Sequence, residues 1–313
     1  MDGIGTILAL IALFYLLGKA ADAVVVNVRN IGERLGVNIF FLGLILGFLT
    51  SLPELSVGIN AISEGVPRIS LGNLFGGILV LFGLILGVSV VINRKIKTDG
   101  DIQGVFQLLL FIVFPFLLGL DGSISWIEGI GIIVAYFLLL AHLYRKNNHL
   151  EKTERITVHK RDLLKNVFFV IAGIVFVIVI SNIIIRMTLS LLESFGIPPF
   201  ITGLLFFSIG TNLPEIIVTI RSWKRHIKEL SVSNLLGSGI ANAMIVGILA
   251  VMKTLPVELD LSYLMTIGVT LFLMWFFLKF YKTGNAFVRR EGVALIGIYG
   301  FFVLTQILFT FLD

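Results

Sequence analysis

Long apolar stretches alternate with short polar loops along the whole chain. Each stretch holds roughly 20 residues, the length that a helix needs to cross ~30 Å of hydrocarbon. We therefore predict an all-α polytopic membrane protein. Its ten transmembrane helices are expected at residues 4–28, 37–62, 69–92, 103–120, 124–143, 164–190, 198–220, 232–252, 261–280 and 292–312.

Composition supports a membrane protein. Of the 313 residues, 57% are hydrophobic and only 14% are charged, and the mean hydropathy is +1.03. So little polar surface cannot coat a soluble globule. The chain has no cysteine and its four histidines lie in or beside polar loops, which excludes a disulfide scaffold and a zinc site of ordinary spacing. We expect no cofactor, and the first span should remain as a helix rather than be cleaved as a signal peptide.

The basic residues predict the orientation. Of 24 Lys and Arg residues, twenty fall in loops on one face, only Arg68 and Lys253 on the other, and Lys19 and Arg186 inside spans. Cytoplasmic loops carry this excess, so both termini should be extracytoplasmic in a multi-pass protein of the cell membrane. We expect the lipid bilayer and small inorganic cations as the partners of the protein. We predict no nucleic-acid partner and no protein partner.

An internal repeat divides the chain. Residues 50–54 (TSLPE) and 211–215 (TNLPE) are 161 positions apart, and the same offset pairs Ser70 with Ser231 and Asn73 with Asn234. The copies lie five spans apart, an odd number, which predicts two inverted five-helix repeats with a site at their interface. We expect a first repeat at 1–143, a basic cytoplasmic linker at 144–162 and a second repeat at 163–313.

Each repeat carries a glutamate inside a span. An ionised carboxylate there is costly and usually faces a cavity or an ion path. Pro53 and Pro214 precede Glu54 and Glu215 and should break each helix. The alternative is that each glutamate pairs with a buried base, for which Lys19 or Arg186 is available.

Two such breaks meeting head to head would gather hard oxygen ligands. Besides the two carboxylates, these would come from Thr50, Ser51, Thr211 and Asn212. Oxygen ligands of this kind suit calcium or sodium and offer nothing to soft metals. Each following helix presents one face to this site. In the second repeat that face is a polar stripe able to complete the site, Asn234, Ser238 and Asn242, while in the first it is Asn73, Gly77 and Leu81, polar only at Asn73.

These motifs resemble those of the calcium/cation antiporter superfamily, and within it the short prokaryotic sodium/calcium exchangers. The family pattern is similar to residues 49–54 (LTSLPE) and 72–77 (GNLFGG) here, and to 210–215 (GTNLPE) and 233–238 (SNLLGS). The resemblance covers the whole chain. It implies calcium and sodium as transported ions, alternating access by sliding of the first and sixth spans, and a set of cation ligands consisting of Glu54, Glu215, Thr50, Ser51, Thr211, Asn212 and Ser238.

The resemblance is not complete. Family members usually carry a serine at the position of Gly77, a polar residue at that of Leu81 and often an aspartate at that of Asn242. In this chain the site would contain two carboxylates, and the number of ions that it binds is left open. A proton-coupled antiporter of the same superfamily is the first alternative, although Leu74 and Phe75 replace its usual acidic residue. A degenerate scaffold or binding protein without transport is the second. An enzyme is not expected, because no span carries a catalytic constellation.

Overall fold

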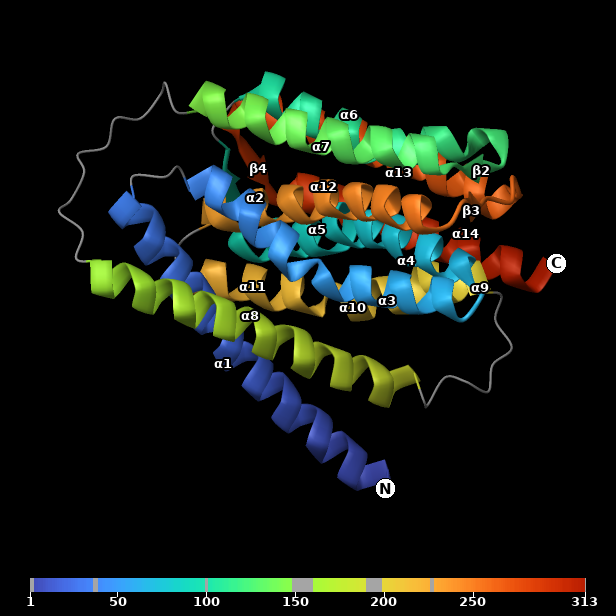
Figure 1. Ribbon diagram of the computed structural model, residues 1–313. Helices are drawn as coiled ribbons and strands as arrows, with labels where there is room; N and C mark the ends of the chain where they lie inside the picture. The colour runs from blue at the N-terminus through green and yellow to red at the C-terminus, as the bar shows by residue number, and fades with distance from the viewer. Residues whose placement is uncertain are drawn as a thin grey trace.

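The computed structural model shows a bundle of long helices, several of them broken near their middle (Figure 1). The residues that the structure describes are 3–35, 39–98, 101–147, 160–189, 199–225 and 228–312. Most of the predicted linker therefore lies outside the described residues.

Helices occupy all ten predicted positions. In the first half the elements are α1 (Gly3–Leu35), α2 (Ile39–Thr50), α3 (Leu52–Ser63), α4 (Pro67–Leu79), the π-helix η1 (Val80–Ile85), α5 (Leu86–Asn93), β1 (Lys95–Lys97), α6 (Ile102–Leu118), the 3-10 helix η2 (Gly119–Asp121), β2 (Ser123–Ile124) and α7 (Trp126–Asn147).

The second half follows a similar order. Its elements are α8 (Lys160–Leu189), α9 (Pro199–Ile201), the π-helix η3 (Thr202–Phe207), α10 (Ser208–Thr211), α11 (Leu213–Lys224), α12 (Lys228–Met252), β3 (Leu255–Pro256), α13 (Leu261–Lys282), the 3-10 helix η4 (Thr283–Asn285), β4 (Ala286–Val288) and α14 (Arg289–Leu312).

Most of these helices can span a membrane. Within the described ranges, eight helices are long and apolar enough, and nine if the bent pair Gly203–Thr211 and Leu213–Lys224 is one span. The 33-residue α1 is not among them, so the count of ten stays a prediction. Large apolar side chains on the outer faces support a multi-pass membrane protein, since Phe137, Phe168 and Phe176 are each more than 60% exposed.

The helix ends sort to the two sides of the bundle. In Figure 1, α1, α7 and α11 end at the left, where β4 also lies. The start of α1 and the end of α14 lie toward the right, with β2 and β3. The two ends of the described chain thus share one side of the bundle.

Two short antiparallel sheets were not expected from the apolar pattern. β1 pairs with β4 through Lys95 opposite Val288, and β2 pairs with β3 through Ser123 opposite Pro256. When 161 is added to their residue numbers, β1 overlaps β3 and β2 comes next to β4. The repeat therefore relates the β1–β4 sheet to the β2–β3 sheet. Each sheet therefore connects a loop of the first half to a loop of the second.

Glycines allow the two halves to approach closely. α2 packs along α12, and α4 packs along η3 and α10. A Cβ at Gly237 would lie 2.6 Å from the carbonyl oxygen of Leu44 and 2.7 Å from its Cα, both in the backbone of α2. At the matching position, Gly76 lies against the backbone of Leu204. The structure therefore shows that both glycines serve close helix packing.

We expect Gly237→Ala to destabilise the protein by about 1–3 kcal/mol, because the added methyl meets backbone that cannot turn aside. Gly268→Ala is the control, since a Cβ there has nothing within 4 Å and alanine favours a helix. Thermal unfolding in detergent measures both variants. Equal midpoints for the two would contradict the packing argument.

Candidate cation site

Both predicted helix breaks are present and have the same backbone geometry. α2 and α3 meet at Ser51 (φ −85°, ψ 9°), and α10 and α11 meet at Asn212 (φ −80°, ψ 9°). Pro53 and Pro214 lie in the first turn of the following helix. The N–H groups of that turn have no partner within the helix, so the N–H that proline lacks costs no hydrogen bond. The second break bends the span by 46°.

The two glutamates stand at the start of the helices after the breaks. Glu54 in α3 and Glu215 in α11 are both 0% exposed. Neither carboxylate oxygen of Glu54 has a hydrogen-bond partner, and neither does Oε2 of Glu215. The two carboxylates are near enough for their charges to repel each other. Burying two carboxylates that repel each other is unfavourable. The positive end of each helix dipole offsets part of this unfavourable free energy, and a bound cation would offset the rest.

No base neutralises these carboxylates in the part of the chain that the structure describes. The buried charged side chains there are Glu54, Glu215 and Glu291, with no lysine or arginine among them. Lys19 is exposed, with its ammonium over the ring of Tyr15. The alternative that Lys19 pairs with a buried glutamate is therefore wrong. The side chain of Arg186 lies outside the described residues.

Two serine hydroxyls, one from each half, converge on Glu215. The Ser238 hydroxyl lies 3.1 Å from Oε1 of Glu215 and 3.2 Å from the carbonyl oxygen of Gly47, so its proton serves either acceptor. The Ser51 hydroxyl lies 3.4 Å from the same Oε1 and 3.0 Å from the same carbonyl. Glu215 is thus held by the first helix break and by α12 together, while neither oxygen of Glu54 has a hydrogen-bond partner.

The two threonines lie across the interface between the halves. Thr211 donates to Oδ1 of Asn73 at 3.0 Å and lies beside Glu54. Thr50 donates to the carbonyls of Leu46 and Gly47 at 3.1 Å each and lies beside Glu215. Each threonine therefore accompanies the glutamate of the other repeat.

Gly47 is a part of the site that sequence reasoning missed. A Cβ there would meet the backbone nitrogen of Ser238 and the carbonyl oxygen of Asn234, so only glycine lets α2 reach α12. Its carbonyl oxygen also lies within hydrogen-bond distance of the hydroxyls of Thr50, Ser51 and Ser238. Its position inside a purely apolar run gave no signal of this role.

Two amide side chains converge on Gly77. A Cβ on Gly77 would lie 2.8 Å from Nδ2 of Asn242 and 3.0 Å from Nδ2 of Asn212. Asn212 Nδ2 donates to the carbonyl of Ser208 at 2.7 Å, while its Oδ1 and both polar atoms of Asn242 have no partner. The bare backbone of α4 therefore makes room for amides from α12 and from the second helix break.

All twelve residues predicted for the site are buried. The set is Glu54, Glu215, Thr50, Ser51, Thr211, Asn212, Ser238, Asn242, Pro53, Pro214, Asn73 and Asn234. Hydrogen bonds join Ser51 and Ser238 to Glu215, and Thr211 to Asn73. Both polar atoms of the Asn234 side chain lack a partner, so no hydrogen bond ties it to this group.

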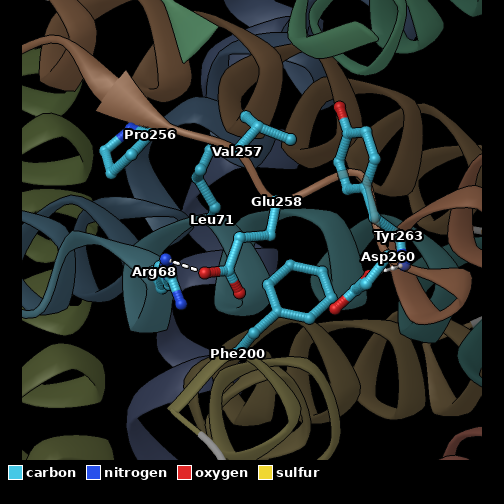
Figure 2. A pocket seen from close by; sticks show the side chains of 8 residues that line it. All are labelled: Arg68, Leu71, Phe200, Pro256, Val257, Glu258, Asp260 and Tyr263. Carbon is cyan, nitrogen blue, oxygen red and sulfur yellow. Dashed lines mark hydrogen bonds and ion pairs between the residues drawn. The ribbon is translucent and has the colours of Figure 1, made fainter. Parts of the chain in front are cut away.

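A pocket at another place contains none of these residues. It lies where α4 begins, next to the loop after β3, and is lined by Arg68, Leu71, Phe200, Pro256, Val257, Glu258, Asp260 and Tyr263 (Figure 2). Arg68 and Glu258 form an ion pair across it. Asp260 accepts from the backbone N–H of Tyr263 and so caps α13. Its charged groups are thus engaged with one another and with the helix end.

The donor set at the helix breaks consists of carboxylate, hydroxyl, amide and carbonyl oxygens. Buried oxygen atoms without partners, from Glu54, Glu215, Asn212 and Asn242, are the ligands that hard cations prefer. No group of three or more His, Cys, Asp and Glu side chains comes together in the described ranges. Oxygen atoms of this kind suit a small, hard cation.

Comparison with known proteins agrees with this chemistry. The family model described as sodium/calcium exchanger protein matches residues 5–145 and 165–308. The chain is 28% identical over 94% of its length, and 94% of the other, to an uncharacterized membrane protein of Methanocaldococcus jannaschii. It is 24% identical to a sodium/calcium exchanger of Methanosarcina acetivorans, over 97% of this chain and 99% of that one. A solved structure of the sodium-calcium exchanger NCX_Mj superimposes with a TM-score of 0.79 at 25% identity, over 96% and 97% of the two chains.

The fold, the buried oxygen site and these matches define a secondary transporter, a multi-pass membrane cation antiporter and not an enzyme. The chain belongs to the sodium/calcium exchanger family, because the family model covers both halves. The predicted family is thereby confirmed.

Proposed function

We propose that this protein exchanges sodium for calcium across the cell membrane by alternating access. The observation that carries the proposal is the pair of fully buried glutamates at two matching helix breaks, with three of their four carboxylate oxygens unpartnered. An arrangement of this kind is stable in a membrane chiefly when a cation is the partner.

The transported ions would be held by groups from both halves. Glu54 and Glu215 supply the charge, and Thr50, Ser51, Thr211, Asn212, Ser238 and Asn242 supply neutral oxygens. Relatives support the choice of ions, since one is named a sodium/calcium exchanger and NCX_Mj structures were obtained after soaking in sodium, calcium or strontium. Ten spans in two inverted repeats, with both termini outside the cytoplasm, would place this site near the bilayer midplane.

Proteoliposomes test the proposal. Vesicles loaded with sodium and diluted into sodium-free medium should accumulate calcium, whereas vesicles with equal sodium on both sides should not. Uptake driven by a proton gradient and not by sodium would favour the proton-coupled antiporter. Absence of uptake with either gradient would overturn the proposal, and unchanged cell function after both glutamates become alanine would favour a scaffold.

A further inference from the structure

Two asparagine–threonine pairs are related by the internal repeat. At the 161-residue offset, Asn73 of α4 matches Asn234 of α12, and Thr50 at the end of α2 matches Thr211 at the end of α10. The inverted repeat therefore predicts two equivalent hydrogen bonds, one from Thr211 to Asn73 and one from Thr50 to Asn234. Each of them would join one half of the protein to the other.

Of these two hydrogen bonds, the structure shows one. The Thr211 hydroxyl donates to Oδ1 of Asn73 at 3.0 Å. The Thr50 hydroxyl donates instead to carbonyls of its own helix, and neither polar atom of the Asn234 side chain has a partner. Asn234 is nevertheless 0% exposed. Buried amides nearly always find partners, because burial without a hydrogen bond is unfavourable, so the amide of Asn234 calls for an explanation.

A difference in helix register accompanies the difference in bonding. A Cβ at Gly237 of α12 would meet the backbone of Leu44 in α2. The repeat predicts that Gly76 of α4 would meet Leu205, but its Cβ would meet the backbone of Leu204, one residue earlier. This contact lies in the π-helix η3, whose turns take more residues than those of an α-helix. Since one residue turns an α-helix by about 100°, the two threonines reach the interface in different orientations.

The two halves can exchange these hydrogen bonds. Both contain the same pair of side chains, so the contact that one half makes is also open to the other. When Thr50 turns from its own helix to Asn234 while Thr211 turns from Asn73 to its own helix, the number of interhelical bonds stays the same. Two states related in this way lie close in free energy, so both can be populated.

We propose that Asn73 and Asn234 are positioning residues that balance the two states of alternating access. The bond from Thr211 to Asn73 stabilises the state described here, and a bond from Thr50 to Asn234 replaces it in the oppositely facing state. Both asparagines thus act through a threonine and not as cation ligands. The inference rests on the proposed alternating-access exchange and adds the residues that hold each of its states.

Single-cysteine labelling tests the exchange of bonds. The chain has no cysteine, so Ser51→Cys at the first helix break gives one reactive thiol in the site. Its reaction with a charged, membrane-impermeant methanethiosulfonate is timed in right-side-out and in inside-out membrane vesicles, without sodium or calcium. Adding Asn73→Ala should change the ratio of the two rates about 5-fold, as expected for the loss of one hydrogen bond. Adding Asn234→Ala should change this ratio by a similar factor in the opposite direction.

Three further variants in the same Ser51→Cys chain separate a switch from a structural contact. Thr211→Ser keeps the hydroxyl and should keep the labelling ratio, whereas Thr211→Val should reproduce the shift of Asn73→Ala. Asn60→Ala is the matched control, because Asn60 is exposed on α3, and it should leave the ratio unchanged. Loss of a merely structural contact would lower the unfolding midpoint without opposite shifts in access.

The outcomes separate this inference from the proposed function. Shifts in the same direction for Asn73→Ala and Asn234→Ala, or a shift in neither, would overturn the exchange of bonds. Sodium-driven calcium uptake by wild-type proteoliposomes is measured in parallel and does not depend on the labelling. Opposite shifts in a protein without such uptake would support the switch and overturn only the ion assignment. Uptake without opposite shifts would overturn the switch alone.

Discussion

Glu54→Gln should abolish sodium-driven calcium uptake without unfolding the protein. The amide has nearly the same shape as the carboxylate, and neither oxygen of Glu54 has a partner to lose. Half of the negative charge disappears, however. One unit charge at ~4 Å contributes about 4 kcal/mol at an effective dielectric of 20, so calcium affinity should fall on the order of 10³-fold. Uptake in vesicles and calcium binding to the purified protein measure the effect.

Thermal unfolding distinguishes whether Glu54 serves as a cation ligand or as a structural group. If Glu54 serves only as a ligand, the unfolding midpoint of Glu54→Gln should be equal to or above that of the wild type, because the repulsion from Glu215 is removed. Glu291→Gln is the control, a buried acid at the start of α14 outside the site, and should keep full uptake. Retained uptake in Glu54→Gln, or a midpoint several degrees lower, would contradict the role of a ligand.

Much of the site could be predicted because its main features are local in sequence. A proline beside a glutamate within an apolar run predicts both a helix break and a polar function, and its recurrence at a fixed offset predicts where the partner lies. The breaks occur at Ser51 and Asn212 with matching backbone angles, and both glutamates are fully buried. Hydropathy alone placed the helices, although several run beyond the predicted limits, as α1 does in ending at Leu35 rather than at residue 28.

The rest depended on how distant segments meet. Gly47 and Gly77 look alike in sequence, yet one contacts the backbone of α12 and the other contacts two amide ends. The sheets β1–β4 and β2–β3 join loops from opposite halves and are too short to give an alternating pattern. The unequal hydrogen bonding of the two glutamates likewise required the positions of Ser51 and Ser238 in space.

Gly77→Val should strongly reduce transport while the helices stay packed. The new side chain would meet Nδ2 of Asn242 and Nδ2 of Asn212, which are the ends of side chains that can rotate away. Rotation would remove both amides from their present positions and put methyl groups in their place. We expect a loss of uptake of roughly 10- to 100-fold, the range seen when groups that orient ligands are lost, with little change in the unfolding midpoint.

Gly76→Val, one residue earlier, is the matched comparison, and we expect it to lower the unfolding midpoint. Its Cβ would lie 2.9 Å from the backbone C and Cα of Leu204 in η3, so α4 and η3 would have to separate. Overpacking of this kind costs about 1–3 kcal/mol, and more where backbone must move. Thermal unfolding and uptake per folded molecule should therefore separate the two variants. If Gly77→Val lowers the midpoint as much as Gly76→Val, then Gly77 serves helix packing, and the amide-lined wall has no distinct role in transport.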